Sequence, residues 1–170
     1  ARQGRGESVF AGQQFIVALE RMIEMAEYGQ RQEDAKWLSA CRSRQRQALE
    51  ACTWDGHWWI RCFDDEARPI GSRSNSYGQM FLNSQSWAVL ANIGSRQQQI
   101  TAMQSVADQL ATDYGIQKIT PSFPTYPEDP DAFSGYAKGC GENGAIFCHA
   151  NCWAIIAECL LGNADRAWDY

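Results

Sequence analysis

The sequence predicts a mainly α fold, built from helices that pack in pairs as hairpins. Apolar residues recur at helical spacing in several segments, and most of these segments end at a glycine. The connections between the segments are long and rich in aromatic residues, which a four-helix bundle does not need. We therefore expect an α/α toroid with short β or aromatic loop segments between its helices.

Two long helices are predicted first, over residues 8–28 and 33–52. The first ends before Gly29, and its apolar residues at helical spacing are Phe15, Leu19, Met22, Ile23 and Ala26. The inner stripe of the second consists of Leu38, Cys41, Ala48, Leu49 and Cys52, whereas the arginines at 42, 44 and 46 form a solvated face. Because the gap between the two helices is short, they should pair as an antiparallel hairpin.

A different pattern occupies the middle of the chain. After a turn at 53–56, residues 57–63 predict a strand dense in aromatic residues, and residues 64–78 predict a polar loop. A helix over 84–93 follows, with Ser84 as its N-cap and Gly94 as its stop. The remaining elements are a helix over 96–114 that ends at Gly115, a proline-rich extended segment over 121–127, and a helix over 150–161 capped by Gly162 and Asn163.

Composition excludes several classes of function. The chain is 45% hydrophobic and 21% charged, as in ordinary soluble globular proteins, and no apolar run approaches the roughly 20 residues of a transmembrane helix. No signal peptide is visible. The net charge of −5 argues against nucleic acid as a partner. The seven cysteines are an odd count without the spacing of a secreted disulfide framework, so we expect reduced thiols in a cytoplasmic protein.

Residues 135–153 (GYAKGCGENGAIFCHANCW) hold the strongest candidate for a site. Their glycines at 135, 139, 141 and 144 allow positive φ and a close approach of the backbone to a ligand. Residues 145–148 predict a buried segment that carries His149 to the start of a helix. A glycine-rich loop, a histidine and a helix N-terminus are the parts of an anion site, because unpaired backbone N–H groups point outward there. The alternative, a loop that only turns the chain, stays open at this point.

Two other chemistries fit the same segment poorly. Cys140, Cys148, His149 and Cys152 together resemble a zinc cluster, but the spacing differs from a paired CxxC site and adjacent ligands are awkward on one tetrahedral ion. A cysteine nucleophile with a histidine base is also disfavoured, because sequence neighbours on extended backbone point to opposite sides. We predict no metal site.

Outside this segment, the histidine, acidic and tryptophan residues that could take part in a site can also be explained by structural roles. His57 is interpreted as a structural or surface histidine. The acids at 64–66 (DDE) suggest glycoside chemistry, but at the start of a loop they are better read as solvated charge. The tryptophans at 54, 58, 59 and 87 could stack on sugar rings and are explained equally well as core residues.

Several motifs together resemble one enzyme family. They occur in order along nearly the whole chain: residues 5–9 (RGESV), 54–56 (WDG), 59–61 (WIR), 81–90 (FLNSQSWAVL), 142–149 (ENGAIFCH), 153–158 (WAIIAE) and 161–167 (LGNADRA). The chain resembles the inverting disaccharide phosphorylases of glycoside hydrolase family 94, the cellobiose and chitobiose phosphorylases. This resemblance implies an (α/α)6 six-hairpin toroid barrel, of which residues 1–170 are about the middle.

The resemblance also implies a reaction. These enzymes use inorganic phosphate as co-substrate to cleave a β-linked disaccharide, and they release an α-sugar 1-phosphate with inversion. One aspartic acid protonates the bridging oxygen while phosphate attacks from the opposite face, so no second carboxylate is needed to activate water. No metal or organic cofactor is implied, and the full-length protein is expected to be a homodimer.

Three residues of this chain match site positions of the family. His149 falls on the phosphate-binding histidine, Glu142 on an acid that contacts sugar hydroxyls, and Tyr136 near an aromatic residue of the acceptor subsite. The position before the acid is commonly lysine in the family, but here it is Gly141, with Lys138 three residues earlier. This difference leaves open which disaccharide is used.

The resemblance places no catalytic residue in this chain. The catalytic aspartate belongs to a motif just before residues 5–8, upstream of Ala1, and a further phosphate contact lies beyond Tyr170. The chain starts without methionine, and residues 165–170 look like a helix just begun, so we expect a domain truncated at both ends and an inactive fragment. Two alternatives remain: an inverting glycoside hydrolase on the same barrel, and a carbohydrate-binding domain without catalysis.

Overall fold

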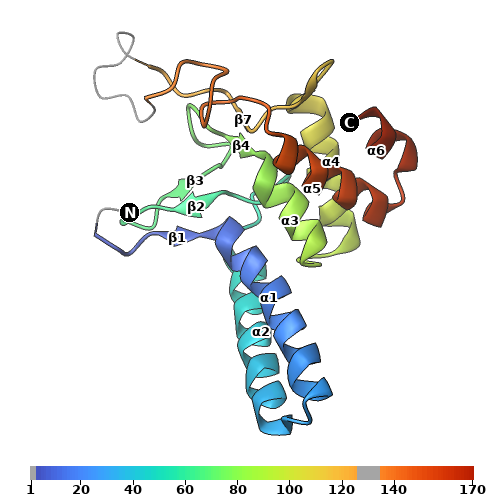
Figure 1. Cartoon of the computed structure of the whole chain (residues 1–170). Coiled ribbons are helices and arrows are strands. Elements are labelled where there is room, and N and C mark those ends of the chain that lie inside the picture. The colour runs from blue at the N-terminus through green and yellow to red at the C-terminus, as the bar shows by residue number, and fades with distance from the viewer. Residues whose placement is uncertain (1–2, 126–134) are drawn as a thin grey trace.

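The computed structural model describes residues 3–125 and 135–170. In these residues the helices are α1 (Val9–Tyr28), α2 (Gln32–Cys52), α3 (Leu82–Leu90), α4 (Arg96–Gln109), α5 (Cys148–Leu161) and α6 (Ala164–Asp169). Figure 1 shows α1 and α2 as a long hairpin that extends from a body formed by the other helices and the strands. The prediction of a mainly α fold with paired helices is confirmed, as a part of an α/α barrel domain requires. No helix in this described part is both long and apolar enough to cross a membrane.

The hairpin of α1 and α2 forms as the periodicity predicts, but its buried face is shifted. Ser8 caps α1 through its Oγ, which accepts a hydrogen bond from the backbone N–H of Ala11 at 3.2 Å. One buried cluster of the hairpin consists of Leu19, Ile23, Ala26, Ala35 and Leu38. Phe15 and Met22 were predicted on the same stripe, yet they are 48% and 49% exposed. The buried stripe passes through Gln13 and Ile16 instead, toward α3.

The predictions for α2 were partly wrong as well. Ala48 and Cys52 are exposed, whereas Leu38 and Leu49 are buried as predicted. Arg46 is not on a solvated face, because its guanidinium donates to the carbonyl oxygens of Ala91, at 3.1 Å, and of Asn92. Those carbonyls lie just after α3, where a helix leaves acceptors without partners, so Arg46 fixes the end of α3 against α2.

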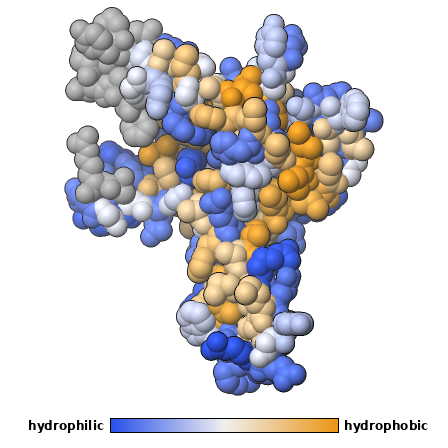
Figure 2. All heavy atoms as spheres, viewed as in Figure 1, coloured by the Kyte–Doolittle hydropathy of each residue, from blue (hydrophilic) through white to orange (hydrophobic). Residues whose placement is uncertain are grey.

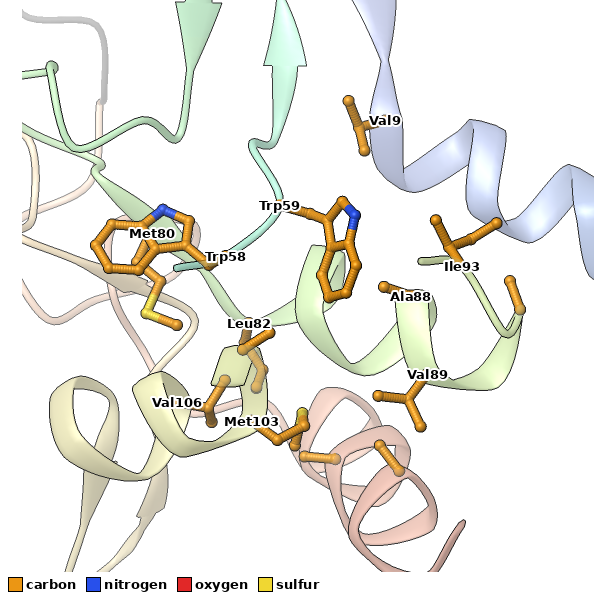
Figure 3. Close-up of a cluster of buried hydrophobic side chains, with 14 of the residues drawn as sticks. Val9, Trp58, Trp59, Met80, Leu82, Ala88, Val89, Ile93, Met103 and Val106 are labelled. Carbon is orange, nitrogen blue, oxygen red and sulfur yellow. The ribbon is translucent and has the colours of Figure 1, made fainter. Parts of the chain in front are cut away.

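The main core surrounds α3, which packs against α1, α4 and α5. Figure 3 shows Trp59 between Val9 at the start of α1 and the side chains of α3. Gln85 of α3 fixes this segment, since its side chain accepts from the backbone N–H of Trp59 and donates to its carbonyl, both at 2.9 Å. Trp58 and Trp59 are therefore core residues, consistent with one of their two predicted readings.

The start of α3 differs from the prediction. The helix begins at Leu82 rather than at residue 84, and Ser84 is fully buried instead of capping it. Strand β4 (Met80–Phe81) runs directly into the helix and pairs with β7 (Ile119–Thr120). The carbonyl oxygen of Lys118 accepts from the N–H of Leu82 at 3.0 Å, so a neighbouring backbone replaces the side-chain cap.

Of the strand predicted over residues 57–63, only the last two residues form a strand in the structure. Strand β2 (Cys62–Phe63) lies between β1 (Glu7–Ser8) and β3 (Pro69–Ile70), and both pairings are antiparallel. Before it, a bridge between Trp54 and Trp59 closes a bend that contains His57. The short sheet holds the residues just before α1 against the loop after β2 (Figure 1).

The C-terminal third positions the candidate site. Helix α4 ends at Gln109, short of the predicted residue 114, because β5 (Ala111–Thr112) and β6 (Gly115–Ile116) turn back as a small hairpin. Residues 121–125 lack regular structure, as predicted, and residues 126–127 of that predicted segment lie outside the described residues. Helix α5 ends at Leu161 and Gly162, with φ of 82°, caps it as predicted. Figure 2 shows hydrophobic side chains exposed over α5. Two apolar residues of this helix, Ile156 and Leu160, are exposed.

Candidate functional site

An open cavity of about 470 Å³ lies between the sheet β1–β2–β3 and the loop that precedes α5. Its wall includes aromatic, cationic and acidic side chains from segments that are distant in the sequence: Glu7, Arg61, Phe81, Lys118, Phe123, Tyr136 and Glu142. The structure thus brings together Glu142 and Tyr136, two of the residues singled out from the sequence. An open cavity with apolar walls and a few polar groups has the general character of a small-molecule site.

Glu142 is not isolated in this cavity. Its carboxylate forms an ion pair with Nζ of Lys118, whose side chain is only 17% exposed, whereas that of Glu142 is 61% exposed. The same ammonium lies 4.6 Å from the centroid of the Phe147 ring. Burial, and secondarily the nearby charge of Arg61, lower the pKa of Lys118. No sequence pattern connects Lys118 with Glu142, because Lys118 is a single lysine in a short segment between two strands.

The geometry around Gly141 disfavours a side chain at the position before Glu142. Gly141 has φ of 48°, and a Cβ at this position would lie 2.6 Å from Cδ1 of Tyr136. The ring of Tyr136 therefore fills the space into which a side chain at 141 would project. The cation that contacts Glu142 comes from Lys118 instead.

Asn143 fixes the loop, and nothing in the sequence had singled it out. Its side chain is fully buried; it accepts from the N–H of Phe123 at 2.8 Å and donates to the carbonyls of Phe123 and Tyr136, both at 3.0 Å. One amide thus ties together two segments of the cavity wall. The glycines at 139, 141 and 144 have positive φ, as predicted, and make this tight loop possible.

Arg61 is the second cation of the cavity. One of its Nη atoms donates to Oγ of Ser8 at 3.0 Å, and its guanidinium lies 5.2 Å from the ring centroid of Phe10 and 6.0 Å from that of Phe81. Burial lowers the pKa of Arg61. Among the described residues, no carboxylate forms an ion pair with Arg61.

The acids at 64–66 are more structured than predicted. The carboxylate of Asp65 accepts the backbone N–H groups of Gln3 at 2.9 Å, Arg5 at 2.8 Å and Gly6 at 3.1 Å. Hydrogen bonds, first from the backbone of Arg68, lower the pKa of Asp64, which also pairs with Nε of Arg68 at 2.7 Å. Reading them as solvated charge was wrong for Asp64 and Asp65. Neither residue forms part of the cavity wall, so they shape the loop and hold the segment before β1.

His149 lies in the first turn of α5, because the helix begins at Cys148 and not at residue 150 as predicted. Its exposed ring packs edge-on against Trp153, with centroids 5.0 Å apart, and lies 5.6 Å from the ring of Phe147. The backbone N–H groups of this turn have no partner inside the helix. His149 is not part of the cavity wall, and the ring of Phe147 contacts both His149 and Lys118. The preceding residues 145–148 are not buried as predicted, since Ile146 and Cys148 are exposed.

The other candidate groups lie elsewhere. None of the predicted stacking tryptophans lines the cavity; Trp54 packs against Trp59, and Trp87 packs against Phe10 and Trp153. The aromatic residues of the wall are Phe63, Phe81, Phe123 and Tyr136, of which only Tyr136 was singled out. The seven cysteines are free thiols, and the residues of the described ranges contain no group of three or more His, Cys, Asp or Glu side chains able to hold a metal ion.

Comparison with known proteins gives a consistent result. The family model described as glycosyl hydrolase 94 superfamily, catalytic domain, matches residues 1–170. Over 169 residues the chain is 35% identical to N,N'-diacetylchitobiose phosphorylase of Vibrio furnissii, an alignment that spans 98% of this chain and 21% of that protein. Over 167 residues it is 30% identical to 3-O-β-D-glucopyranosyl-β-D-glucuronide phosphorylase of Paenibacillus borealis, spanning 98% of this chain and 22% of that protein. Over 133 residues it is 32% identical to cellobionic acid phosphorylase of Neurospora crassa, spanning 74% of this chain and 17% of that protein. The chain spans about a fifth of the length of these curated relatives, and it belongs to the glycosyl hydrolase 94 superfamily as part of the catalytic domain.

Proposed function

We propose that the full-length protein is a phosphorylase of β-linked disaccharides. It transfers a glycosyl group reversibly to inorganic phosphate, with inversion, and yields an α-sugar 1-phosphate and a free sugar. The observation that carries this proposal is the match of the whole chain to relatives that are themselves disaccharide phosphorylases. Cellobiose- and chitobiose-like disaccharides are the substrates to test first.

The residues of the cavity fit the sugar side of this reaction. The carboxylate of Glu142 can accept hydrogen bonds from pairs of sugar hydroxyls, and its ion pair with Lys118 orients it. The rings of Tyr136, Phe81 and Phe123 offer flat apolar surface to a sugar face. Glu142 and Tyr136 are therefore proposed to bind the sugar.

Phosphate is already a nucleophile at neutral pH, so the protein needs chiefly to position it and balance its charge. We assign this role to His149 and to the backbone N–H groups of the first turn of α5. In this proposal the aspartic acid that protonates the leaving sugar belongs to the part of the full-length protein upstream of Ala1. Asp65 contributes by fixing the backbone of residues 3–6. No cofactor is required, and the proposal includes a cytoplasmic homodimer.

The first test is the reaction itself. The full-length protein is incubated with cellobiose and with diacetylchitobiose, with and without phosphate, and sugar 1-phosphate is assayed. Formation of sugar 1-phosphate only with phosphate is the expected result. Free sugar released regardless of phosphate would identify a hydrolase instead. Binding of sugar without any product would favour the non-catalytic carbohydrate-binding domain.

The second test addresses His149. His149→Ala should raise the KM for phosphate about tenfold or more, because a hydrogen bond to a charged ligand is lost. The KM for the disaccharide should change much less. His57→Ala is the matched control, since His57 is also exposed but lies outside the cavity and away from α5. Equal increases in both KM values would remove His149 from the phosphate site.

A further inference from the structure

The imidazole of His149 contacts two aromatic rings of its own segment. Its exposed ring meets the indole of Trp153 with centroids 5.0 Å apart and an angle of 81° between the ring planes. The ring of Phe147, the N-cap residue of α5, lies 5.6 Å away. His149 and Trp153 are four residues apart in α5, so their side chains lie on the same face of the helix.

These ring contacts determine how the imidazole is oriented. A histidine that binds a ligand through one ring nitrogen is often oriented by a hydrogen bond at the other nitrogen. Within residues 3–125 and 135–170, the side chain of His149 makes ring contacts and no hydrogen bond. An exposed side chain that samples several rotamers must be fixed when a ligand binds, and this ordering lowers affinity. Packing against the aromatic rings therefore takes over the orienting role.

Trp153 is itself held in place by rings from two other helices. Its indole packs on Trp87 of α3 with centroids 5.4 Å apart and on Phe10 of α1 at 5.9 Å, and those two rings lie 6.0 Å from each other. Helix α3 packs against both α1 and α5, as Figure 1 shows for α3 and α5, and Trp153 is partly buried against the main core. The indole therefore offers His149 a rigid surface that three helices support.

We propose that Trp153 is a positioning residue for phosphate, because its indole holds the imidazole of His149 in the orientation that donates to a phosphate oxygen. Trp153 acts through His149 and needs no contact of its own with the ligand. Phosphate binds more tightly as a result, since the imidazole loses little rotamer freedom on binding. This inference rests on the proposed function for the role of His149 in binding phosphate.

The experiment begins with binding, which needs no turnover. Isothermal titration calorimetry measures the affinity of the full-length protein for inorganic phosphate, and kinetics give the KM values for phosphate and for the disaccharide. Trp153→Leu keeps an apolar side chain but removes the ring, so it should weaken phosphate binding about fivefold. The KM for the disaccharide should change much less. Trp153→Phe keeps a ring and should recover most of the lost affinity, and it provides the test if Trp153→Leu does not fold.

A double-mutant cycle with His149→Ala separates an action through His149 from a general effect on the fold. In the His149→Ala background, Trp153→Leu should leave phosphate binding nearly unchanged, because the side chain that it positions is absent. The KM for phosphate extends this cycle to affinities too weak for calorimetry. Trp54→Leu is the matched control, since Trp54 is also partly buried against the main core but packs edge-on against Trp59 rather than against His149. It should not change phosphate binding in either background.

The outcomes separate this inference from the proposed function. Phosphate binding that is unchanged in Trp153→Leu, or that weakens equally with and without His149, would overturn the inference even if the enzyme is a phosphorylase. Binding as weak in Trp153→Phe as in Trp153→Leu would also overturn it and indicate that the indole N–H contacts phosphate directly. Unchanged phosphate binding in His149→Ala would refute the proposed phosphate role of His149 and the inference with it. The expected cycle without any phosphate-dependent product would support the inference and refute the proposed reaction.

Discussion

Replacing Asn143 by alanine tests whether one buried amide holds the cavity together. The side chain of Asn143 makes all of its hydrogen bonds with backbone groups, at Phe123 and Tyr136. The methyl group of alanine cannot make any of these hydrogen bonds. It can itself be buried at this position without cost, so the loss comes from the backbone groups that lose their partner. The substitution should therefore loosen two segments of the wall, residues 121–125 and 135–144, without removing any group proposed to touch the ligand.

The size of the effect follows from these contacts. Each hydrogen bond of this kind contributes about 1 kcal/mol net, and a buried group left without its partner costs about 1–3 kcal/mol. The backbone of Phe123 and of Tyr136 lies in partly exposed segments, so water can replace part of the loss. We therefore expect the free energy of opening this loop to fall by about 2 kcal/mol, which makes its open state about 30-fold more populated.

Amide hydrogen exchange of the full-length protein is the direct assay, because it reports local opening residue by residue. Asn151→Ala is a matched control. Asn151 is also buried and also makes three side-chain hydrogen bonds to backbone, two with Ile116 and one with Phe147. It joins β6 to α5, outside the loop. Asn143→Ala should accelerate exchange in 135–144, and Asn151→Ala should accelerate it at 115–117.

The reasoning would be refuted by either of two results. Exchange in residues 135–144 that rises less than about threefold in Asn143→Ala would mean that the amide does not hold the loop. Exchange that rises equally there in both variants would mean that the effect is a general loss of stability. A parallel measurement of sugar affinity should show a larger loss in Asn143→Ala than in Asn151→Ala.

Three further predictions concern the cavity. Glu142→Gln should weaken sugar binding and leave the KM for phosphate nearly unchanged, since one acceptor oxygen becomes a donor; unaltered sugar kinetics would remove Glu142 from the site. Gly141→Lys should reduce stability in thermal unfolding by about 1–2 kcal/mol, because its positive φ and the ring of Tyr136 oppose a side chain, and an unchanged Tm would contradict that geometry. The pKa of Lys118 is lowered in the folded state from its ordinary value of 10.5, so the unfolded chain binds more protons just below pH 10.5 and the contribution of Lys118 to stability rises with pH in that range. Comparing the pH dependence of unfolding with that of Lys118→Met checks this sign, and a difference that falls with pH would contradict it.

Local sequence signals were sufficient to predict those helices whose length and ends are set by their own residues. Helices α1, α2 and α5 have long apolar repeats and clear stops, and their predicted bounds agree with the structure to within a few residues. Errors occur where a neighbouring segment replaces a local signal. The carbonyl of Lys118 caps α3 in place of Ser84, and the hairpin β5–β6 ends α4 early. Such substitutions depend on distant backbone, which a single sequence does not reveal.

The residues of the candidate site also fall into those that local sequence predicted and those that depend on distant backbone. Tyr136 and Glu142 could be found because they lie in one glycine-rich loop whose pattern is visible in the sequence. Asn143 lies in the same loop and was missed, because its role depends on the backbone of Phe123. For the tryptophans at 54, 58, 59 and 87, sugar stacking and core packing were both left open; Trp58 and Trp59 are buried in the core, and none of the four lines the cavity.

The cations show why a charge pattern alone cannot locate an anion site. Arg46 and Arg61 both belong to segments that read as ordinary helix or strand, and neither has a sequence neighbour that indicates its role. The guanidinium of Arg46 already donates hydrogen bonds to the carbonyls that follow α3, so few of its N–H groups remain for a ligand. Arg61 meets a hydroxyl and two rings, which desolvate its charge without balancing it. The fold sets the partners of each cation, since Arg46 meets carbonyl oxygens and Arg61 meets a hydroxyl and two rings, and neither set of partners is visible in the sequence around the arginine.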